Sequence, residues 1–181
     1  MKFEALPLEG AFLITKESKF DKRGSFTRTF CAREFQNNGL KYNFVQHNQS
    51  FSKYKGTLRG LHFQNEPFKE VKVVTCTQGK IFDVIVDIRK NSPTFLKWYG
   101  IELSAESNNS LYIPEGFAHG FITLVDSSEI SYLVSNYYEP SFEDGIHYMD
   151  TKVNINWPVE VKAISEKDKN RVFLNDDFMG I

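Results

Sequence analysis

The sequence predicts an all-β fold, a sandwich or barrel of short strands, and three observations support this class. Runs of β-branched and aromatic residues recur at regular intervals along the chain. Clusters of turn-forming residues separate the runs. No long stretch has the 3.6-residue apolar period of an amphipathic helix. Short strands separated in this way are typical of sandwiches and barrels.

The predicted strands occupy the middle of the chain. In order they are Val71–Cys76, Lys80–Ile88, Leu96–Leu103, Ser110–Ile113, Gly120–Val125 and Ile130–Val134. The turn-forming residues between the later strands are Asn91-Ser92-Pro93, Asn108-Asn109, Pro114-Glu115-Gly116 and Asp126-Ser127-Ser128. Only Gln78-Gly79 separates the first two strands, which predicts a hairpin between them.

Two short helices are expected outside the sheets. One covers Ala32–Asn37 and the other lies near Ser165–Lys169. Ser165 is a suitable N-cap for the second helix, with Asp168 three residues later, a weak capping signal.

The chain is expected to form a single domain over residues 1–181, because no linker, repeat or composition shift divides it. Its 41% hydrophobic content is enough for a substantial core. Lys and Arg total 22 against 23 Asp and Glu, which excludes the positive excess that nucleic acids and anionic membranes require. Cys31 and Cys76 provide neither a disulfide framework nor a CxxC zinc motif.

No apolar run reaches the roughly 18 residues that span a bilayer. Glu4 and Glu9 interrupt the segment that a signal peptide would need to keep apolar. We therefore expect a soluble cytoplasmic protein with neither nucleic acid nor membrane as a partner.

Gly56–Gln64 (GTLRGLHFQ) is the densest polar and aromatic segment. Arg59 and His62 are three residues apart, so a regular strand would place them on opposite faces. The two glycines imply turns or close backbone approach, which leaves the faces open. Such an Arg can clamp a phosphate and such a His can move protons. An exposed Arg and a hydrogen-bonded core His are the alternative interpretation.

Ile113–Phe121 (IPEGFAHGF) contains a Pro-x-Gly-x-x-His turn that aims the imidazole of His119 inward from a strand end. Such turns occur in cupin barrels, where the His often binds a metal. A metal site would also need a second imidazole upstream, but the matching segment reads His62-Phe63-Gln64. The sequence therefore disfavours a metal ion.

Two further segments carry groups for proton transfer. Ser131–Pro140 (SYLVSNYYEP) holds three tyrosines, which suit either sheet packing or a buried general acid. Ser165–Asp168 (SEKD) holds a carboxylate that could orient a His. Spacing alone does not show that Asp168 meets His62.

Taken in order, these segments resemble the dTDP-4-dehydrorhamnose 3,5-epimerase family. The resemblance runs from about Asp21 to Asp168 and includes GTLRGLHFQ, IFDVIVDIRKNSPTF, IPEGFAHGF, YLVSNYYEP, INWP and SEKD. It implies a cupin-like jelly-roll barrel with short peripheral helices, no cofactor and a homodimer. It also implies epimerisation at C3 and C5 of a nucleotide-diphosphate-linked 4-keto-6-deoxy sugar, in deoxysugar, capsule or lipopolysaccharide precursor synthesis.

The resemblance implies catalytic roles for four residues. His62 is the expected base with Asp168 as its partner, Tyr132 the expected acid, and Lys72 the group that stabilises the enolate. Residues expected to bind the nucleotide or sugar are Arg23, Phe26, Arg28, Gln46, Asn48, Arg59, His119, Tyr138, Glu143 and Lys167. Phe26 fits an aromatic that packs on the nucleobase, which the partner subunit could supply.

Departures from the family pattern leave the nucleobase open. Arg28 stands where a Glu is usual, His47 where an Asp is usual, and Phe68-Lys69-Glu70-Val71 where a Gln-Gly pair commonly precedes the lysine. A carboxylate can accept from the N–H of thymine, whereas an Arg only donates and suits the O6 and N7 of guanine. Substrates linked to dTDP and to GDP, including the GDP-linked heptoses used by some relatives in capsule synthesis, are both consistent with the sequence.

Four other interpretations differ in class or in detail. They are an epimerase that inverts C3 only, a metal-dependent cupin isomerase or dioxygenase using His62 and His119, a non-catalytic sugar-binding module, and a 3,4-ketoisomerase. The presence of His62, Lys72, Tyr132 and Asp168 together favours the epimerase, since binding alone needs no acid and base.

Overall fold

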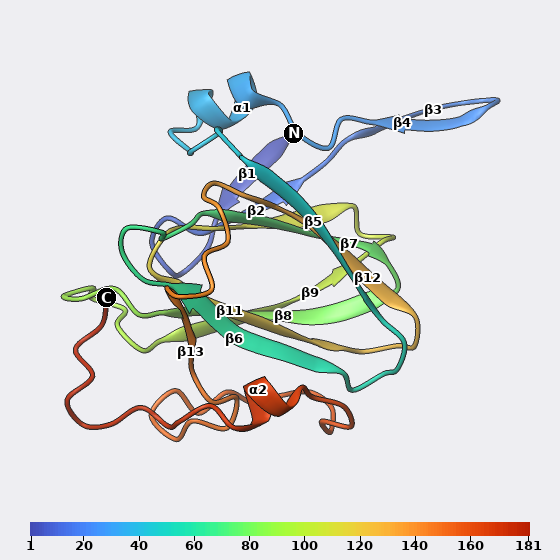
Figure 1. Ribbon diagram of the computed structural model, residues 1–181. Helices are drawn as coiled ribbons and strands as arrows, with labels where there is room; N and C mark the ends of the chain where they lie inside the picture. Colours follow the sequence, from blue (N-terminus) through green and yellow to red (C-terminus); the bar gives the residue numbers. More distant parts are fainter.

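The computed structural model describes residues 1–181 as two facing β-sheets with short helices and long loops at the edges (Figure 1). The first sheet has the order β1-β2-β10-β7-β12-β5 and the second the order β13-β6-β11-β8-β9. The first sheet contains β1 (Lys2–Ala5), β2 (Phe12–Thr15), β5 (Gln46–Ser52), β7 (Lys72–Gln78), β10 (Asn109–Ile113) and β12 (Ser128–Val134). The second contains β6 (Leu58–Gln64), β8 (Lys80–Asp87), β9 (Trp98–Ser104), β11 (Phe117–Thr123) and β13 (Glu143–Gly145). The architecture is the predicted jelly-roll-like, all-β fold.

Apolar side chains from both sheets form the main core between them. Val74, Leu111 and Ile113 from the first sheet meet Ile81 and Ile85 from the second, all essentially excluded from solvent. Because strand side chains alternate between faces, every second residue of β7 and β10 points into this core. The core fills only part of the space between the sheets, and the other part is the cavity described below.

The predicted strands are all present, but the predicted hairpin at Gln78-Gly79 is wrong. β7 pairs with β10 and β12, whereas β8 pairs with β11 and β9, so this turn carries the chain from one sheet to the other. The turn residues and the β-branched flanks are local features, and they do not determine which distant strand supplies the hydrogen-bond partners. Long-range pairing therefore decided the topology here.

The two predicted helices are confirmed. α1 covers Ala32–Asn37, and α2 covers Glu166–Lys169. Ser165 caps α2 by accepting a hydrogen bond from the backbone N–H of Asp168, at 3.0 Å. The predictions lack β1–β6 and β13. Most of these strands are short or polar, but β2 (FLIT) is apolar and was missed because it is only four residues long.

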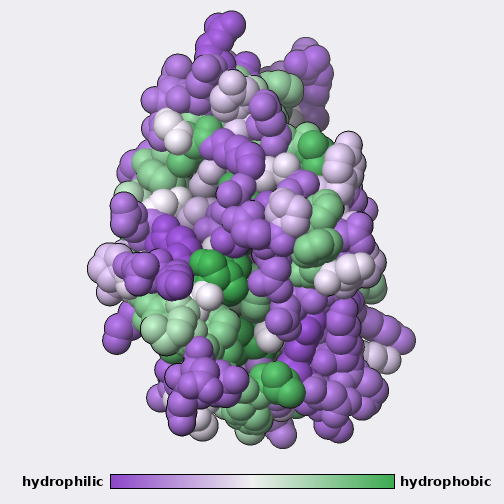
Figure 2. Space-filling model, turned by 60° about the vertical axis from the view of Figure 1, so that its left-hand side comes forward, coloured by the Kyte–Doolittle hydropathy of each residue, from purple (hydrophilic) through white to green (hydrophobic).

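A two-stranded hairpin of β3 (Ser18–Asp21) and β4 (Gly24–Thr27) extends away from the sheets (Figure 1). The side chains of Phe20 and Phe26 are largely exposed on it, at 80% and 67%. Elsewhere on the surface, Figure 2 shows hydrophobic patches scattered among hydrophilic side chains. None of the helices combines the length and the apolar character needed to cross a membrane.

Candidate active site

A cavity of about 680 Å³ lies between the two sheets and is open to solvent. The first sheet contributes side chains from β5, β7 and β12, and the second contributes side chains from β6, β11 and β13, with α2 at the rim. The predicted site residues that line it are Gln46, Asn48, Arg59, His62, Lys72, His119, Tyr132, Tyr138, Glu143, Lys167 and Asp168.

Strand register places one group of these residues on the inner face of the first sheet. Tyr132 lies opposite Asn48 in the pairing of β12 with β5, and Val134 lies opposite both Gln46 and Lys72. Paired residues of antiparallel strands share a face, so all of these side chains project into the cavity. The intervening residues of the same strands point away from it.

The second wall depends on an irregularity in β6. The register of β6 with β11 shifts between His119 and Phe121. Here the backbones come so close that a Cβ on Gly60 would lie 2.5 Å from the Cα of Gly120. The shift allows Arg59 and His62, three residues apart, to line the same cavity. Arg59 and His62 therefore face the same cavity, which their spacing in the sequence does not determine.

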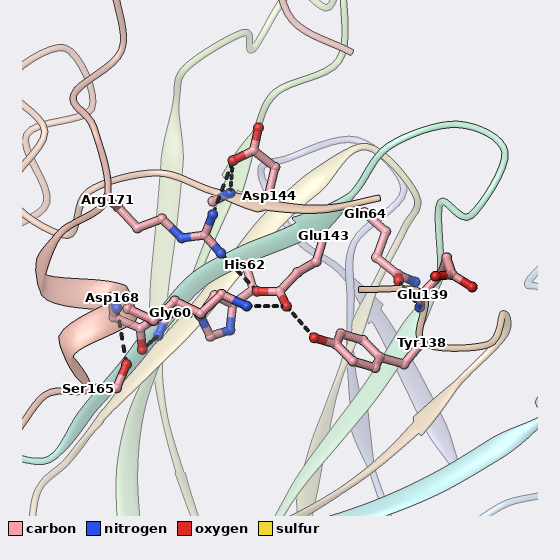
Figure 3. A network of polar contacts seen from close by, with 12 residues as sticks. Gly60, His62, Gln64, Tyr138, Glu139, Glu143, Asp144, Ser165, Asp168 and Arg171 are labelled. Carbon is pink, nitrogen blue, oxygen red and sulfur yellow. Dashed lines mark hydrogen bonds and ion pairs between the residues drawn. The ribbon is translucent and has the colours of Figure 1, made fainter. Parts of the chain in front are cut away.

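His62 and Asp168 form a hydrogen-bonded pair in the second wall, with 2.6 Å between Nε2 and Oδ1 (Figure 3). The Asp168 side chain is 5% exposed and that of His62 is 35% exposed, so the imidazole faces the cavity. Burial raises the pKa of Asp168, but the hydrogen bond and charge of His62 outweigh burial and the net pKa is below its usual value. The pair unites residues 106 apart in sequence.

Glu143 is the centre of a second polar network beside this pair (Figure 3). Its carboxylate accepts from Lys167 at 2.6 Å, from Arg171 at 2.8 Å and from the hydroxyl of Tyr138 at 2.5 Å. Burial raises the pKa of Glu143, yet Lys167, Tyr138 and the nearby His62 lower it overall. These contacts fix the carboxylate at the cavity rim.

His119 lies directly opposite His62 in the strand pairing and has its own carboxylate partner. Its Nε2 lies 3.0 Å from both oxygens of the fully buried Asp83, whose pKa is raised by burial. No three His, Cys, Asp or Glu side chains are grouped so that they could hold a metal ion.

Tyr132 and Arg59 complete the charged and polar lining. Burial raises the pKa of Tyr132, the charge of Glu70 raises it further, and Arg59 acts in the opposite direction. Arg59 donates to Ser52 Oγ at 3.2 Å and to the carbonyl oxygen of Phe51 at 3.0 Å. These bonds fix the guanidinium at one side of the cavity.

Three predicted residues lie outside the cavity lining, on or just after the β3–β4 hairpin. Arg23 is paired with Asp21, Phe26 is exposed, and Arg28 forms an ion pair with Glu34 at 3.3 Å. Within one chain the structure does not bring these three side chains together with the others.

Several residues of the site were not predicted. Asp83 lies in a run that indicates only a buried strand, and Arg171 lies beyond the last quoted motif. Glu70 has no assigned role in the sequence prediction, although its two-residue spacing from Lys72 indicates a shared face.

Comparison with known proteins agrees with this fold. The family model described as dTDP-4-dehydrorhamnose 3,5-epimerase matches residues 5–176. The enzyme of that name from Shigella flexneri is 49% identical over 160 residues, which cover 87% of this chain and 88% of the relative. A crystal structure of the Bacillus anthracis enzyme with TDP and PPi bound has a TM-score of 0.93 and 40% identity, covering 96% of this chain and 99% of that one.

A dTDP-4-dehydrorhamnose 3-epimerase from Streptomyces niveus is also similar, with 36% identity over 96% of this chain and 84% of the relative. Fold, cavity and relatives together define a nucleotide-sugar epimerase, which is an isomerase. The chain belongs to the dTDP-4-dehydrorhamnose 3,5-epimerase family.

Proposed function

We propose that this protein inverts C3 and C5 of a dTDP-linked 4-keto-6-deoxy hexose by removing a proton from one face of the sugar and returning one to the other. The observation that carries this proposal is the position of His62 and Tyr132 on opposite sheets of one cavity. Inversion needs a base and an acid on opposite faces of the reacting carbon, and two facing walls provide that arrangement.

The chemistry follows from the ketone at C4. A C–H bond beside a carbonyl can lose its proton because the resulting enolate spreads its charge onto oxygen. His62 takes that proton as the base, and Asp168 holds the imidazole in orientation and stabilises its charged form. The ammonium of Lys72, with an almost buried side chain, stabilises the enolate oxygen. Tyr132 then donates a proton to the opposite face, so the carbon is inverted.

The remaining cavity residues suit the nucleotide and the sugar. The guanidinium of Arg59 binds the diphosphate, since Arg forms paired hydrogen bonds with phosphate oxygens. Gln46 and Asn48 offer amide donors and acceptors from β5 to the nucleotide and sugar. His119, Tyr138, Glu143 and Lys167 contact the same ligand.

Thymine is the first candidate for the nucleobase, because relatives that are 49% and 45% identical to this chain are named as epimerases of a dTDP-linked sugar. Guanine remains the second candidate because of Arg28, which has only donors where the family pattern has an acceptor. Within one chain, the Arg28 guanidinium forms an ion pair with Glu34.

The direct test is solvent deuterium incorporation. The protein is incubated in D2O with a dTDP-linked 4-keto-6-deoxy hexose and, separately, with a GDP-linked 4-keto-6-deoxy heptose, and proton NMR and mass are followed. We expect deuterium at C3 and C5 of the dTDP sugar. Deuterium at C3 alone would identify a 3-epimerase, and exchange only in the GDP sugar would identify guanine as the base. No exchange in either sugar by the folded protein would contradict the proposal.

We also propose that the protein is a homodimer in which the β3–β4 hairpin reaches the partner's cavity. The exposed Arg23 and Phe26 would then contact the diphosphate and the base of the ligand bound there. An aromatic side chain stacked on a base contributes about 1–3 kcal/mol. Phe26→Ala is therefore expected to raise the Kd for dTDP about tenfold, measured by calorimetry.

Mixed dimers decide whether Phe26 acts across the interface. Subunits with Phe26→Ala and subunits with His62→Asn are mixed after each is shown to be weak or inactive alone. If the aromatic is supplied in trans, a mixed dimer contains one intact site, and activity rises on mixing. Unchanged activity in a verified mixed dimer would contradict the shared site, as would a monomer by sedimentation equilibrium.

A further inference from the structure

Glu70 is a carboxylate inside the cavity that the proposed reaction does not use. It lies in the loop between β6 and β7 and lines the cavity. The loop is tied to the segment after β12, because Ser135 Oγ accepts from the backbone N–H of Val71 at 2.8 Å. Gln64 also donates to the carbonyl oxygen of Phe68 at 3.0 Å. The backbone on both sides of Glu70 is therefore held in place.

Glu70 and Lys72 form an ion pair within the cavity wall. They flank Val71, which is buried in an apolar cluster on the other side of the chain, so both charged side chains point into the cavity. The Glu70 side chain is 8% exposed, and its Oε1 accepts a hydrogen bond from Lys72 Nζ. An ammonium has three donors, so two remain for a ligand while the first fixes the side chain.

The charge of Glu70 also acts on Tyr132. Burial is the largest cause of the raised pKa of this tyrosine, and Glu70 is the next, while Arg59 opposes both. An anion nearby disfavours the phenolate and so favours the form that can donate a proton. The charged and titratable side chains that face the cavity with Tyr132 are Arg59, His62, Glu70, Lys72, His119, Tyr138, Glu143, Lys167 and Asp168.

We propose that Glu70 is a positioning residue that aims the Lys72 ammonium at the ketone oxygen of the sugar. This inference rests on the proposed function, in which Lys72 and Tyr132 act on the substrate. The negative charge of Glu70 repels a ligand that carries a diphosphate. The ion pair with Lys72 reduces this repulsion.

The test compares Glu70→Gln with two controls. Glu70→Asp keeps the charge. Glu129→Gln removes a carboxylate from a partly exposed position of β12, the strand of Tyr132, where its partners are Thr77 and Gln49. We expect Glu70→Gln to lower kcat between about tenfold and a hundredfold, because small displacements of an aligned group have effects of that size. KM and the Kd for dTDP should change little. Glu129→Gln should match the unsubstituted protein.

The pH dependence separates positioning from a purely structural role. Removing the anion lowers the pKa of Tyr132, so the alkaline limb of the kcat profile should move to lower pH in Glu70→Gln but stay in place in Glu70→Asp. Above this limb, C3 deuterium exchange should continue while inverted product falls. A kcat of Glu70→Gln within twofold of the unsubstituted protein would overturn the proposal.

A second measurement does not depend on turnover. Tyrosine ring carbons are labelled with 13C, the Tyr132 signal is assigned by its loss in Tyr132→Phe, and its titration is followed by NMR. The titration should move to lower pH in Glu70→Gln and stay unchanged in Glu129→Gln. An unmoved titration would contradict the effect of Glu70 on Tyr132 even if the protein proved to act on another substrate. Failure of the proposed function would instead appear as absent exchange in the unsubstituted protein.

Discussion

His62→Asn is expected to abolish deuterium exchange at C3 and C5 while dTDP still binds. An asparagine side chain has no group that can take up a proton at neutral pH, so the first step of the reaction is lost. General-base catalysis contributes about 10²–10⁴-fold, and a loss of at least that size should appear in the exchange rate. The substitution should fold, because the imidazole is partly exposed to the cavity. Exchange rates are followed by NMR and nucleotide affinity by calorimetry.

Tyr132→Phe is the matched variant on the opposite wall. It should still exchange the abstracted proton, since His62 is intact, but it should yield little inverted product because no acid reaches the second face. Exchange at normal rates in His62→Asn would remove His62 as the base. Normal product formation in Tyr132→Phe would likewise remove Tyr132 as the acid. The two variants together therefore assign one group to each face.

Asp87→Ala is expected to have the largest effect on stability. The carboxylate is fully buried at the end of β8 and accepts hydrogen bonds from Arg89, Ser92 and Thr94. Removing the carboxylate breaks its hydrogen bonds with Arg89, Ser92 and Thr94, and a hydrogen bond to a charged group contributes about 1.5–3 kcal/mol. The Arg89 guanidinium is partly exposed, so water compensates part of its lost pairing. A lower urea midpoint with an unchanged m-value would show this loss. A midpoint equal to that of the unsubstituted protein would contradict it.

The same contacts make the stability of the protein decrease in acid. Burial raises the pKa of Asp87, but Arg89, Ser92 and Thr94 outweigh it and lower the pKa from 3.8 to about 2. This difference is worth about 2 kcal/mol of stability. That share is fully present above pH 4 and is lost as the pH falls through about 2. The difference in unfolding free energy between Asp87→Ala and the unsubstituted protein should therefore become smaller as the pH falls.

Asp21 offers a control with the same local geometry. It accepts from the backbone and side chain of Arg23 two residues later, as Asp87 does from Arg89. Both partners are exposed on the β3–β4 hairpin, where solvent screens the pair. Asp21→Ala should therefore leave the urea midpoint unchanged. An equal loss in both variants would show that burial is not the cause.

Local signals were enough to predict the helices and the central strands. The Ser165 cap and the short polar helix after it can be identified because capping acts within one turn. The β-branched runs identify β7, β8 and β12 for a similar reason, since alternation and side-chain branching are local features. The order of strands in the sheets could not be predicted in the same way. The Gln78-Gly79 turn shows the reason, because one turn sequence can join two strands of one sheet or carry the chain from one sheet to the other.

The sequence by itself determined the family, the all-β class and most residues of the candidate site, because long motifs retain their order and residue types. Only the tertiary structure decided how those residues meet. The contact of His62 with Asp168 spans 106 positions, and the shared face of Arg59 and His62 depends on a register shift between β6 and β11. The pairing of Glu70 with Lys72 inside the cavity depends on loop anchors at Gln64 on β6 and at Ser135, just after β12. Such contacts depend on distant segments packing together, and no local property of the chain specifies which segments these will be.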